Sequence, residues 1–491
     1  MPAGTAAPRG RRRPKTPMLF PTVDFAIFFV CVFAVAWLIR PWHLGWRIFL
    51  VLASWFFYAF WEPEFVLLLI GSTAVNWAIG RDLAQMRDEA GKPTPGARAL
   101  LTFGITLNLF TLGWFKYYGF FAEELDGLFG VFGMGNPIPL KEITLPIAIS
   151  FFTFHAISYL VDIVRGEIAE PMSPLDFALY LSFFPHLVAG PIVRVTEFAP
   201  QIREPVTKRL IDAAPAFQLI LFGLFKKVVI SSYLSKQIAD PVFASPGSHS
   251  AFEVIVGVYA YAVQIFADFS GYTDIAIGCA LLLGIRFPQN FDAPYRALSL
   301  QDFWRRWHMT LSRWLRDYLY IPLGGNRGTK AFIYRNLFIT MVLGGLWHGA
   351  AFTFIVWGAI HGGGLVVERE LRERFPGRLG RAAPVLHWLI TFHVVCLAWV
   401  FFRAETFGAA WEILGRMVTG WGASPAVTPL LLLVIAGSIA SQFVPPRWWE
   451  RVQVSFSKLA PAAQAGTLAL GLVLIDALGP EGVAPFIYFQ F

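Results

Sequence analysis

Residues 337–350 read LFITMVLGGLWHGA, an apolar run that ends at a histidine flanked by tryptophan and glycine. Such a run is typical of a helix that lies in lipid. The rest of the chain has the same character, because 56% of its 491 residues are hydrophobic and only 15% are charged, well below the charged share of a soluble domain. The composition therefore predicts a multi-pass membrane protein.

Apolar runs suited to crossing about 30 Å of hydrocarbon recur along the chain. They cover residues 19–40, 46–61, 64–80, 99–116, 143–164, 214–234, 251–284, 332–346, 350–366, 384–402, 426–444 and 464–479. This series predicts roughly 11 to 13 crossings. Because lipid offers the backbone no hydrogen-bond partners, crossings of this length must be helices rather than barrel strands. We expect an all-α fold in which residues 18–491 form one integral-membrane domain.

A basic tail precedes this domain at residues 1–17, where residues 9–15 read RGRRRPK. Its charge favours a cytoplasmic N-terminus, whereas the short loops that follow favour an outer one. Met18 begins the sequence MLFPTVDF, which leads directly into the first apolar run. We hypothesise that translation begins at Met18 or that the tail is disordered. Finding residues 1–17 by amino-terminal sequencing of the native protein would reject the late start.

Hydropathy falls sharply between residues 284 and 335. Basic residues outnumber acidic ones there, with Arg286, Arg296, Arg305, Arg306, Arg313, Arg316, Arg327, Lys330 and Arg335 against Asp292, Asp302 and Asp317. An excess of positive charge in a short loop predicts the cytoplasmic face, where we expect this segment to carry the catalytic chemistry. The basic loop 445–458 is assigned to the same face, which places the final APFIYFQF outside. The net charge of +8 thus reports orientation and does not indicate a nucleic-acid partner.

Residues 301–320 have the periodicity of a helix. One side carries Trp304, Trp307, Leu311, Leu315 and Tyr318, and the other carries Arg305, Arg306, Arg313 and Arg316. His308 lies on the apolar side. Two interpretations stand: an interfacial helix that rests on lipid headgroups, with His308 as a packing residue, or a site at which the arginines meet an anionic cytosolic ligand.

His348 follows an apolar run and is expected a turn or more inside the membrane. A polar side chain there is costly unless it has a partner, and most such residues are functional. Gly344, Gly345 and Gly349 leave room beside the ring for a second helix or for a substrate. His348 is therefore either a neutral base or a packing residue bonded to a carbonyl, and His361, in GAIHGGG, has the same two interpretations.

Two further stretches place polar groups where lipid is expected. DFSGYTDIAIG (268–278) puts Asp268 and Asp274 after an apolar run, where carboxylates must be paired, protonated or in a wet cavity. FFPHLVAGPIVR (183–194) has two prolines in an apolar run, which predicts a broken or re-entrant segment. His186 and Arg194 within it either line a pathway or cap broken helix ends.

Several motifs of other enzyme classes are absent from the sequence. It has no G-x-x-x-x-G-K-[ST] phosphate loop, no H-E-x-x-H and no cysteine–histidine spacing for zinc. PLGGNRG (322–328) is glycine-rich but a weak match to a phosphate loop. We therefore predict neither ATP-driven transport within this chain nor a metal site.

Five stretches, in order, resemble the membrane-bound O-acyltransferases, and in particular their bacterial alginate O-acetylase branch. They are FFPHLVAGPIVR, DFSGYTDIAIG, RFPQNFDAPY, FWRRWHMTLSRWLRDYLYIPLGGNR and LGGLWHGAAFTFIVWGAIHG. The resemblance extends from about residue 18 to the C-terminus and leaves residues 1–17 outside. It implies a ring of helices around a tunnel, an acyl thioester delivered from the cytosol, and an acyl group passed towards the outer face.

The resemblance also implies roles for two histidines. His348 matches the membrane histidine of the family, and His308 matches its second catalytic histidine. An imidazole, with an ordinary pKa near 6.5, suits a base that takes a hydroxyl proton, and we assign that role to His348. His308 would polarise the thioester carbonyl or stabilise the oxyanion. The thioester, acetyl-CoA or an acyl-carrier thioester, is a co-substrate, and we expect no tightly bound cofactor.

The remaining candidates surround this pair. Arg305, Arg306, Arg313 and Arg316 either hold the phosphates of the donor or contact headgroups. Asp268, Asp274, His186, Arg194 and His361 are candidate tunnel-lining residues. Tyr488, in the terminal FIYFQF, is a candidate acyl relay, because related D-alanylation systems use a partner peptide with a similar terminal motif; the alternative is an aromatic anchor at the membrane interface.

The expected function is O-acetylation of a secreted polysaccharide such as alginate. The protein would lie in the bacterial inner membrane, surrounded by lipid, and a periplasmic acetyltransferase or esterase-like partner would complete the transfer. D-alanyl or fatty-acyl cargo is the first alternative. A proton-coupled transporter that uses Asp268, Asp274 and His348 is the second, and it predicts substrate movement without consumption of a thioester.

Overall fold

The computed structural model describes residues 18–61, 63–134, 139–141, 143–188, 190–205, 207, 213–375, 383–480, 482, 486 and 487. Secondary structure in this part of the chain is helical, apart from one isolated bridge between Arg87 and Pro93. The all-α prediction is confirmed. The tail at residues 1–17 lies outside the described residues, so the proposed start at Met18 stays a prediction.

The helices fall into four consecutive groups along the chain. The first group is α1 (Val23–Ile39), α2 (His43–Ala59), α3 (Pro63–Gln85), α4 (Pro95–Val131), α5 (Ile149–Arg165), α6 (Pro174–Ser182), α7 (Phe184–Leu187) and α8 (Val195–Arg203). The second is α9 (Ala213–Leu224), α10 (Ser232–Leu234) and α11 (Asp240–Ala244), joined by the π-helical turns η2 (Phe225–Ser231) and η3 (Ser235–Ala239), then α12 (Ala251–Leu282). The third is α13 (Leu300–Arg306), α14 (Met309–Leu315), the π-helical turn η6 (Arg316–Tyr320), α15 (Lys330–His348), α16 (Phe352–Arg374) and α17 (Ala383–Arg403). The last is α18 (Phe407–Arg416), α19 (Pro429–Ser441), α20 (Pro446–Ser457) and α21 (Pro461–Leu478).

Each predicted apolar run overlaps a helix, and the multi-pass fold is confirmed. Within the described ranges, six helices are long and apolar enough to cross a membrane, or seven if α19 and α20, which meet at 93°, form one broken span. This number of helices is lower than the roughly 11 to 13 crossings predicted from the apolar runs. The reason is physical: α1, α2 and α5 have 17 residues each, and α15 and α16 carry charged side chains.

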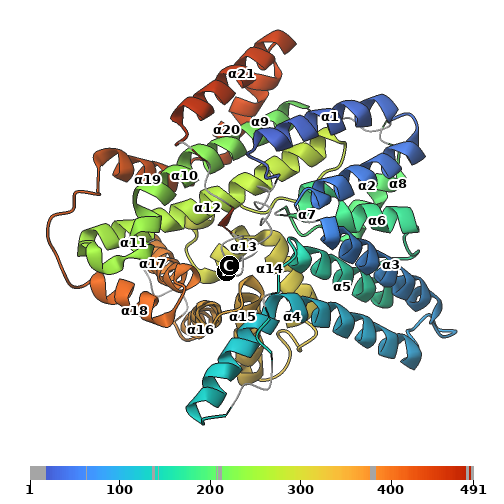
Figure 1. The fold of residues 1–491 in the computed structure, drawn as a ribbon, viewed down its shortest axis with the longest axis horizontal. Coiled ribbons are helices and arrows are strands. Elements are labelled where there is room, and N and C mark those ends of the chain that lie inside the picture. Colours follow the sequence, from blue (N-terminus) through green and yellow to red (C-terminus); the bar gives the residue numbers. More distant parts are fainter. Residues whose placement is uncertain are drawn as a thin grey trace, which may run out of the picture.

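The helices surround the middle of the molecule, where α13 and α14 lie (Figure 1). The helices α1 to α5 form one side of this arrangement, and α11, α12, α17 and α18 lie on the other. Helix α12 is the most buried of the crossing helices, whereas few of the residues of α4 and α21 are buried. That exposure is expected of surfaces that face lipid.

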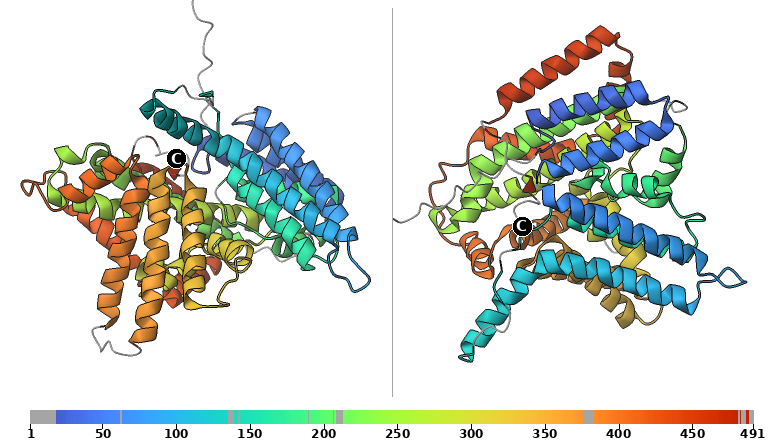
Figure 2. Two further views of the ribbon diagram at one scale, coloured as in Figure 1. Left: turned by 90° about the horizontal axis from the view of Figure 1, so that it is seen from below. Right: turned by 45° about the vertical axis from the view of Figure 1, so that its right-hand side comes forward.

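Helices α15, α16 and α17 lie side by side (Figure 2). Glycines permit the close approach of the first two. A Cβ atom on Gly345 would overlap the carbonyl oxygen of Phe354, and one on Gly358 would overlap that of Met341. The prediction that small residues beside His348 admit a second helix is therefore confirmed for Gly345.

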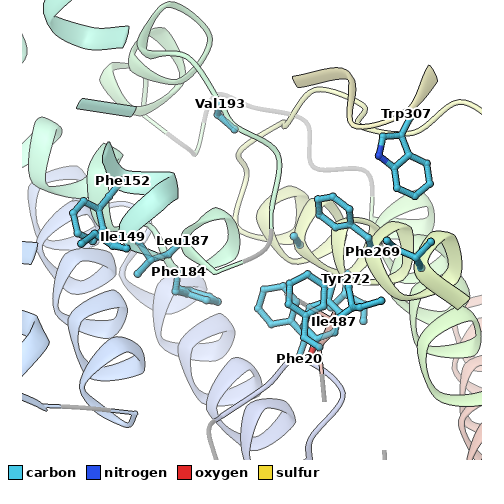
Figure 3. Close-up of a cluster of buried hydrophobic side chains, with 14 of the residues drawn as sticks. Phe20, Ile149, Phe152, Phe184, Leu187, Val193, Phe269, Tyr272, Trp307 and Ile487 are labelled. Atoms are coloured by element: carbon cyan, nitrogen blue, oxygen red, sulfur yellow. The ribbon is translucent and has the colours of Figure 1, made fainter. Parts of the chain in front are cut away.

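The core joins segments that are far apart in the sequence. Figure 3 shows Phe20, Tyr272 and Ile487 close together, and all three are buried. Phe486 also packs on Tyr272, with ring centroids 4.1 Å apart. The N-terminal entry to α1, the middle of α12 and the C-terminal segment thus share one hydrophobic core.

Candidate active site

The predicted break in residues 183–194 is present. Helix α6 ends at Ser182, the single turn α7 follows, and a non-helical stretch leads to α8. His186 lies on α7 and is fully buried, and its Nε2 donates to the carbonyl oxygen of Tyr180 at 2.9 Å. Its ring lies 4.7 Å from that of His155. The contacts of His186 fit the helix-end interpretation.

The predicted helix over residues 301–320 is interrupted. His308 has φ +43° and ψ +54°, a left-handed conformation that a helix cannot contain, so α13 ends before it and α14 begins after it. The apolar side is nevertheless as predicted, because Trp307 and Leu311 are buried. The apolar side of the segment therefore packs within the protein, and Arg305 and Arg316 on the other side are exposed.

His308 is held by a residue that the sequence analysis did not single out. Asn290 Oδ1 accepts hydrogen bonds from the Thr310 backbone N–H at 3.1 Å and the Thr310 hydroxyl at 2.8 Å, and it lies 3.2 Å from His308 Nδ1. Because the backbone N–H is a donor, the shared atom must be an oxygen, and Nδ1 of His308 must carry the hydrogen. In a neutral His308, Nε2 is then an acceptor. The sequence signal that could have identified Asn290 was its place in RFPQNFDAPY, one of the five stretches that carry the family resemblance.

His348 is the last residue of α15 and is 5% exposed. Three aromatic rings surround its imidazole edge to face: Trp347 at 5.0 Å, Trp357 at 5.1 Å and Phe402 at 5.3 Å between centroids. An apolar cage of this kind favours a neutral imidazole, which is the form that can act as a base.

His348 is one of the residues that line a cavity of about 230 Å³. Lys116 of α4, Ser150 at the start of α5 and Trp347 also line it. The cavity therefore brings together a base candidate, a cation and a hydroxyl at the junction of three helices. Lys116 was missed by the sequence analysis, although a lysine near the end of the apolar run 99–116 was a visible signal.

The two catalytic candidates both lie near one tryptophan. The Trp347 ring is 5.0 Å from His348 and 6.4 Å from His308. His308 is not among the described residues that line the cavity. The structure thus brings the two histidines into one aromatic cluster but gives them different surroundings.

His361 belongs to the same cluster. It is fully buried, its Nδ1 accepts a hydrogen bond from Trp304 Nε1 at 3.3 Å, and its ring lies 4.9 Å from that of Trp357. Trp357 also contacts His348, so His361 packs against one of the three rings that surround His348. It does not border the cavity within the described chain.

Three of the four arginine candidates are already paired with carboxylates. Arg306 contacts Asp292 at 2.9 Å and Asp302 at 2.8 Å, Arg313 contacts Glu197 through two nitrogens at 2.7 and 3.3 Å, and Arg316 contacts Asp317 at 2.6 Å. Arg305 is exposed, and no carboxylate of the described residues pairs with it. Arg305 is therefore the member of the set whose charge is least compensated.

Arg194 belongs to this charged network as well. It forms an ion pair with Asp317, and its guanidinium lies 5.3 Å from the Tyr318 ring centroid. Burial raises the pKa of Asp317, but hydrogen bonds from Arg316 and Arg194 outweigh this effect and leave that pKa below its usual range. The network thus stays ionised at neutral pH.

Asp268 and Asp274 are paired, which is one of the three predicted possibilities. Asp268 forms a buried ion pair with Lys227, and Asp274 contacts Lys226 at 2.5 Å. Both lysines interrupt the apolar run 214–234, so the signal for these partners was present in the sequence. Neither aspartate borders the cavity.

The C-terminal segment reaches the same region. The backbone N–H of Ile487 donates to Asp268 Oδ2 at 2.9 Å, and Phe486 lies 6.0 Å from Phe269, which itself lies 4.7 Å from the His308 ring. Phe486 is thus one aromatic ring away from His308. Tyr488 lies outside the described residues.

Comparisons with known proteins give a consistent result. A model described as MBOAT, membrane-bound O-acyltransferase family, matches residues 133–410. A Pseudomonas aeruginosa protein named "Probable alginate O-acetylase AlgI" is 43% identical over 373 residues, 76% of this chain and 69% of that protein. A Pseudomonas putida protein of the same name is 38% identical over 471 residues, 91% of this chain and 94% of that protein. The peptidoglycan O-acetyltransferase of Helicobacter pylori is 40% identical over 398 residues, 76% of this chain and 73% of that protein.

Proposed function

The chain belongs to the membrane-bound O-acyltransferase family, and from this premise we propose that it takes an acetyl group from a cytosolic thioester and passes it across the membrane for O-acetylation of an exopolysaccharide such as alginate. The observation that carries the proposal is the position of His348. Its imidazole lies among three aromatic rings, and the residue lines a cavity, which is the position expected of a base that meets a hydroxyl inside the membrane.

We assign His348 as the general base. A ring nitrogen takes the proton of the acceptor hydroxyl while the oxygen attacks the thioester carbonyl carbon. The new C–O bond forms, the C–S bond breaks, and the proton passes from the imidazole to the departing thiolate. The thiolate of a thioester is a good leaving group, so proton transfer at His348 is the main catalytic contribution that the step requires.

We propose that His308 assists at the carbonyl. Its Nδ1 hydrogen bond to Asn290 leaves Nε2 as an acceptor in the neutral ring. His308 can therefore stabilise an oxyanion only after Nε2 gains a proton, which converts it to a cation with two donors. In this proposal His308 acts as a cation, whereas His348 starts the reaction as a neutral ring.

We propose acetyl-CoA or an acyl-carrier thioester as the donor. Arg305 is the best candidate for contact with donor phosphates, because carboxylates already offset the charge of Arg306, Arg313 and Arg316. The positive charge of the segment 284–335 supports a cytosolic position for this entrance.

The same charge pattern supports the bacterial inner membrane as the location and the outer face for the C-terminus. An acetyl group released there needs an acceptor that carries it to the polymer. We propose a periplasmic acetyltransferase or esterase-like protein as that partner. Tyr488 is proposed as the relay that receives the acetyl first. The burial of Phe486, which contacts Phe269 and through it the region of His308, supports a C-terminal tail at the site.

Replacement of His348 tests the function. We expect His348→Ala to lower acetyl transfer from acetyl-CoA per folded molecule roughly 100- to 10,000-fold, the usual contribution of a general base, while the protein still folds and inserts. The measurement is the release of free coenzyme A, together with the O-acetyl content of the polymer, for protein reconstituted with its partner. His393→Gln is the control, because His393 is exposed and bonds to Tyr259 on the outside of the bundle.

Each competing interpretation gives another result. A packing role for His348 would reduce the amount of folded protein and leave the activity per molecule intact. A transporter would move substrate with no release of coenzyme A from acetyl-CoA. D-alanyl transfer would leave acetyl-CoA unused but would consume a D-alanyl carrier thioester.

A further inference from the structure

Helix α15 ends at His348, and the last four carbonyl groups of a helix have no partner within it. Two side chains of α4 take up three of these groups. Lys116 Nζ donates to the carbonyl oxygen of His348 at 3.0 Å and to that of Trp347. Tyr117 Oη donates to the carbonyl oxygen of Leu346 at 2.7 Å. Helix α4 therefore holds the end of α15 residue by residue, up to the histidine itself.

These contacts lie at the cavity. Lys116 lines it together with His348, and among the described lining residues it is the one lysine or arginine. The chain leaves α15 at Gly349, whose backbone is extended, so the last turn is not continued by further helix. Ends of helices fray when their terminal carbonyls have no partner. The position of the His348 ring thus depends on partners outside α15.

We propose that Lys116 and Tyr117 are positioning residues for acyl transfer. They fix the last turn of α15 through its carbonyls, and in this way they aim the imidazole of His348 at the cavity. This inference rests on the proposed function, because it treats His348 as the base. The two residues act through the backbone of α15, so their loss should misalign the base without removing the site for the hydroxyl.

Four variants test the proposal by steady-state transfer from acetyl-CoA. Lys116→Met removes the donor at similar length, Tyr117→Phe removes one hydroxyl, and Lys116→Arg keeps donors in reach of both carbonyls. Tyr118→Phe is the matched control, since the Tyr118 hydroxyl, one residue along α4, donates instead to the carbonyl oxygen of Pro139 at 2.7 Å.

We expect Lys116→Met to lower kcat roughly ten-fold or more, and Tyr117→Phe to lower it about three-fold, with KM unchanged in both. Lys116→Arg should recover part of the loss, and Tyr118→Phe should match the wild type. A wild-type kcat in Lys116→Met, or a raised KM with normal kcat, would overturn the positioning role. If Lys116→Met fails to fold, the milder Tyr117→Phe decides the question.

A second measurement needs no turnover. The rate at which diethyl pyrocarbonate modifies His348, read by mass spectrometry, reports how the ring is presented to the cavity. It should change several-fold in Lys116→Met and stay constant in Tyr118→Phe; a constant rate in both would overturn the proposal. If the wild type transfers no acyl group while the modification rate responds as expected, the proposed function fails and the positioning of His348 stands.

Discussion

Asn290 determines which nitrogen of His308 is open to chemistry, although the two side chains are 18 positions apart. Its Oδ1 binds His308 and both donors of Thr310, and the backbone N–H of Met309 also donates to the Asn290 carbonyl at 2.9 Å. One asparagine therefore supports the left-handed turn at His308 and fixes its tautomer.

Removal of the Asn290 amide should disturb both the left-handed turn at His308 and the tautomer of its ring. We expect Asn290→Ala to lower acetyl transfer roughly ten-fold or more and to destabilise the protein by about 1 to 3 kcal/mol, because a buried backbone N–H loses its acceptor. Gln289→Ala is the matched control: the neighbouring amide is exposed and donates only to the carbonyl of Phe291, at 2.7 Å, among the described groups. Coenzyme A release per folded molecule and thermal unfolding are the measurements. Wild-type transfer in Asn290→Ala would show that the His308 tautomer does not matter.

For individual residues, the sequence indicated which side chains could carry the chemistry but not how they are arranged in space. His348 and His308 stood out because imidazoles are rare on apolar surfaces, and the structure brings both into one aromatic cluster. Lys116 and Asn290 did not stand out, since their importance comes from carbonyls and ring nitrogens on other elements. A polar residue in or beside an apolar run is visible in the sequence, but the distant backbone group on which it acts is not.

Among the elements, α15 and α16 form the closest helix pair around the site, and the glycines differ in what they face. Gly345 packs directly on the backbone of α16, where a Cβ would overlap the carbonyl oxygen of Phe354. A Cβ on Gly344 would instead lie 3.2 Å from Cδ1 of Leu315, the end of a flexible side chain. Adjacent glycines therefore have different tolerance for a methyl group.

This difference gives a prediction on stability. Gly345→Ala should separate α15 from α16 and lower the free energy of unfolding by about 1 to 3 kcal/mol, the range for overpacked cores. Gly344→Ala should cost much less, because Leu315 can turn away. Thermal unfolding in detergent compares the two variants, and equal melting temperatures would contradict the packing argument.

The elements also show where periodicity fails. Residues 301–320 have a single amphipathic pattern, yet the chain forms two short helices separated by His308. Hydrophobic periodicity reports which side is buried, and that side was predicted correctly. It does not detect one residue with positive φ, because the residues on both sides keep the same pattern after the break.

For the whole molecule, the apolar runs predicted the helices but not the pairing between them. Lys227 and Asp268 are 41 positions apart, and Lys226 and Asp274 are 48 apart. The sequence left the aspartates paired, protonated or in a wet cavity, and although Lys226 and Lys227 were visible in another apolar run, it did not show which lysine meets which aspartate. The same limit applies to the C-terminal segment, whose Ile487 backbone N–H reaches Asp268 across more than two hundred residues.

That three-way contact gives a test of whether the C-terminal segment must be anchored for transfer. Lys227→Met leaves the Asp268 carboxylate buried without this cation and should destabilise the protein by about 3 to 5 kcal/mol. The double variant Lys227→Met/Asp268→Leu removes both charges and should recover most of that stability. The double variant also removes the acceptor for the Ile487 N–H, so its acetyl transfer should be low although its stability is recovered. Tyr488→Phe should lose transfer with no loss of stability. Thermal unfolding measures the effect on stability, and coenzyme A release measures the effect on transfer. Full transfer in the double variant would show that the contact between Ile487 and Asp268 is dispensable. Full transfer in Tyr488→Phe would reject the relay.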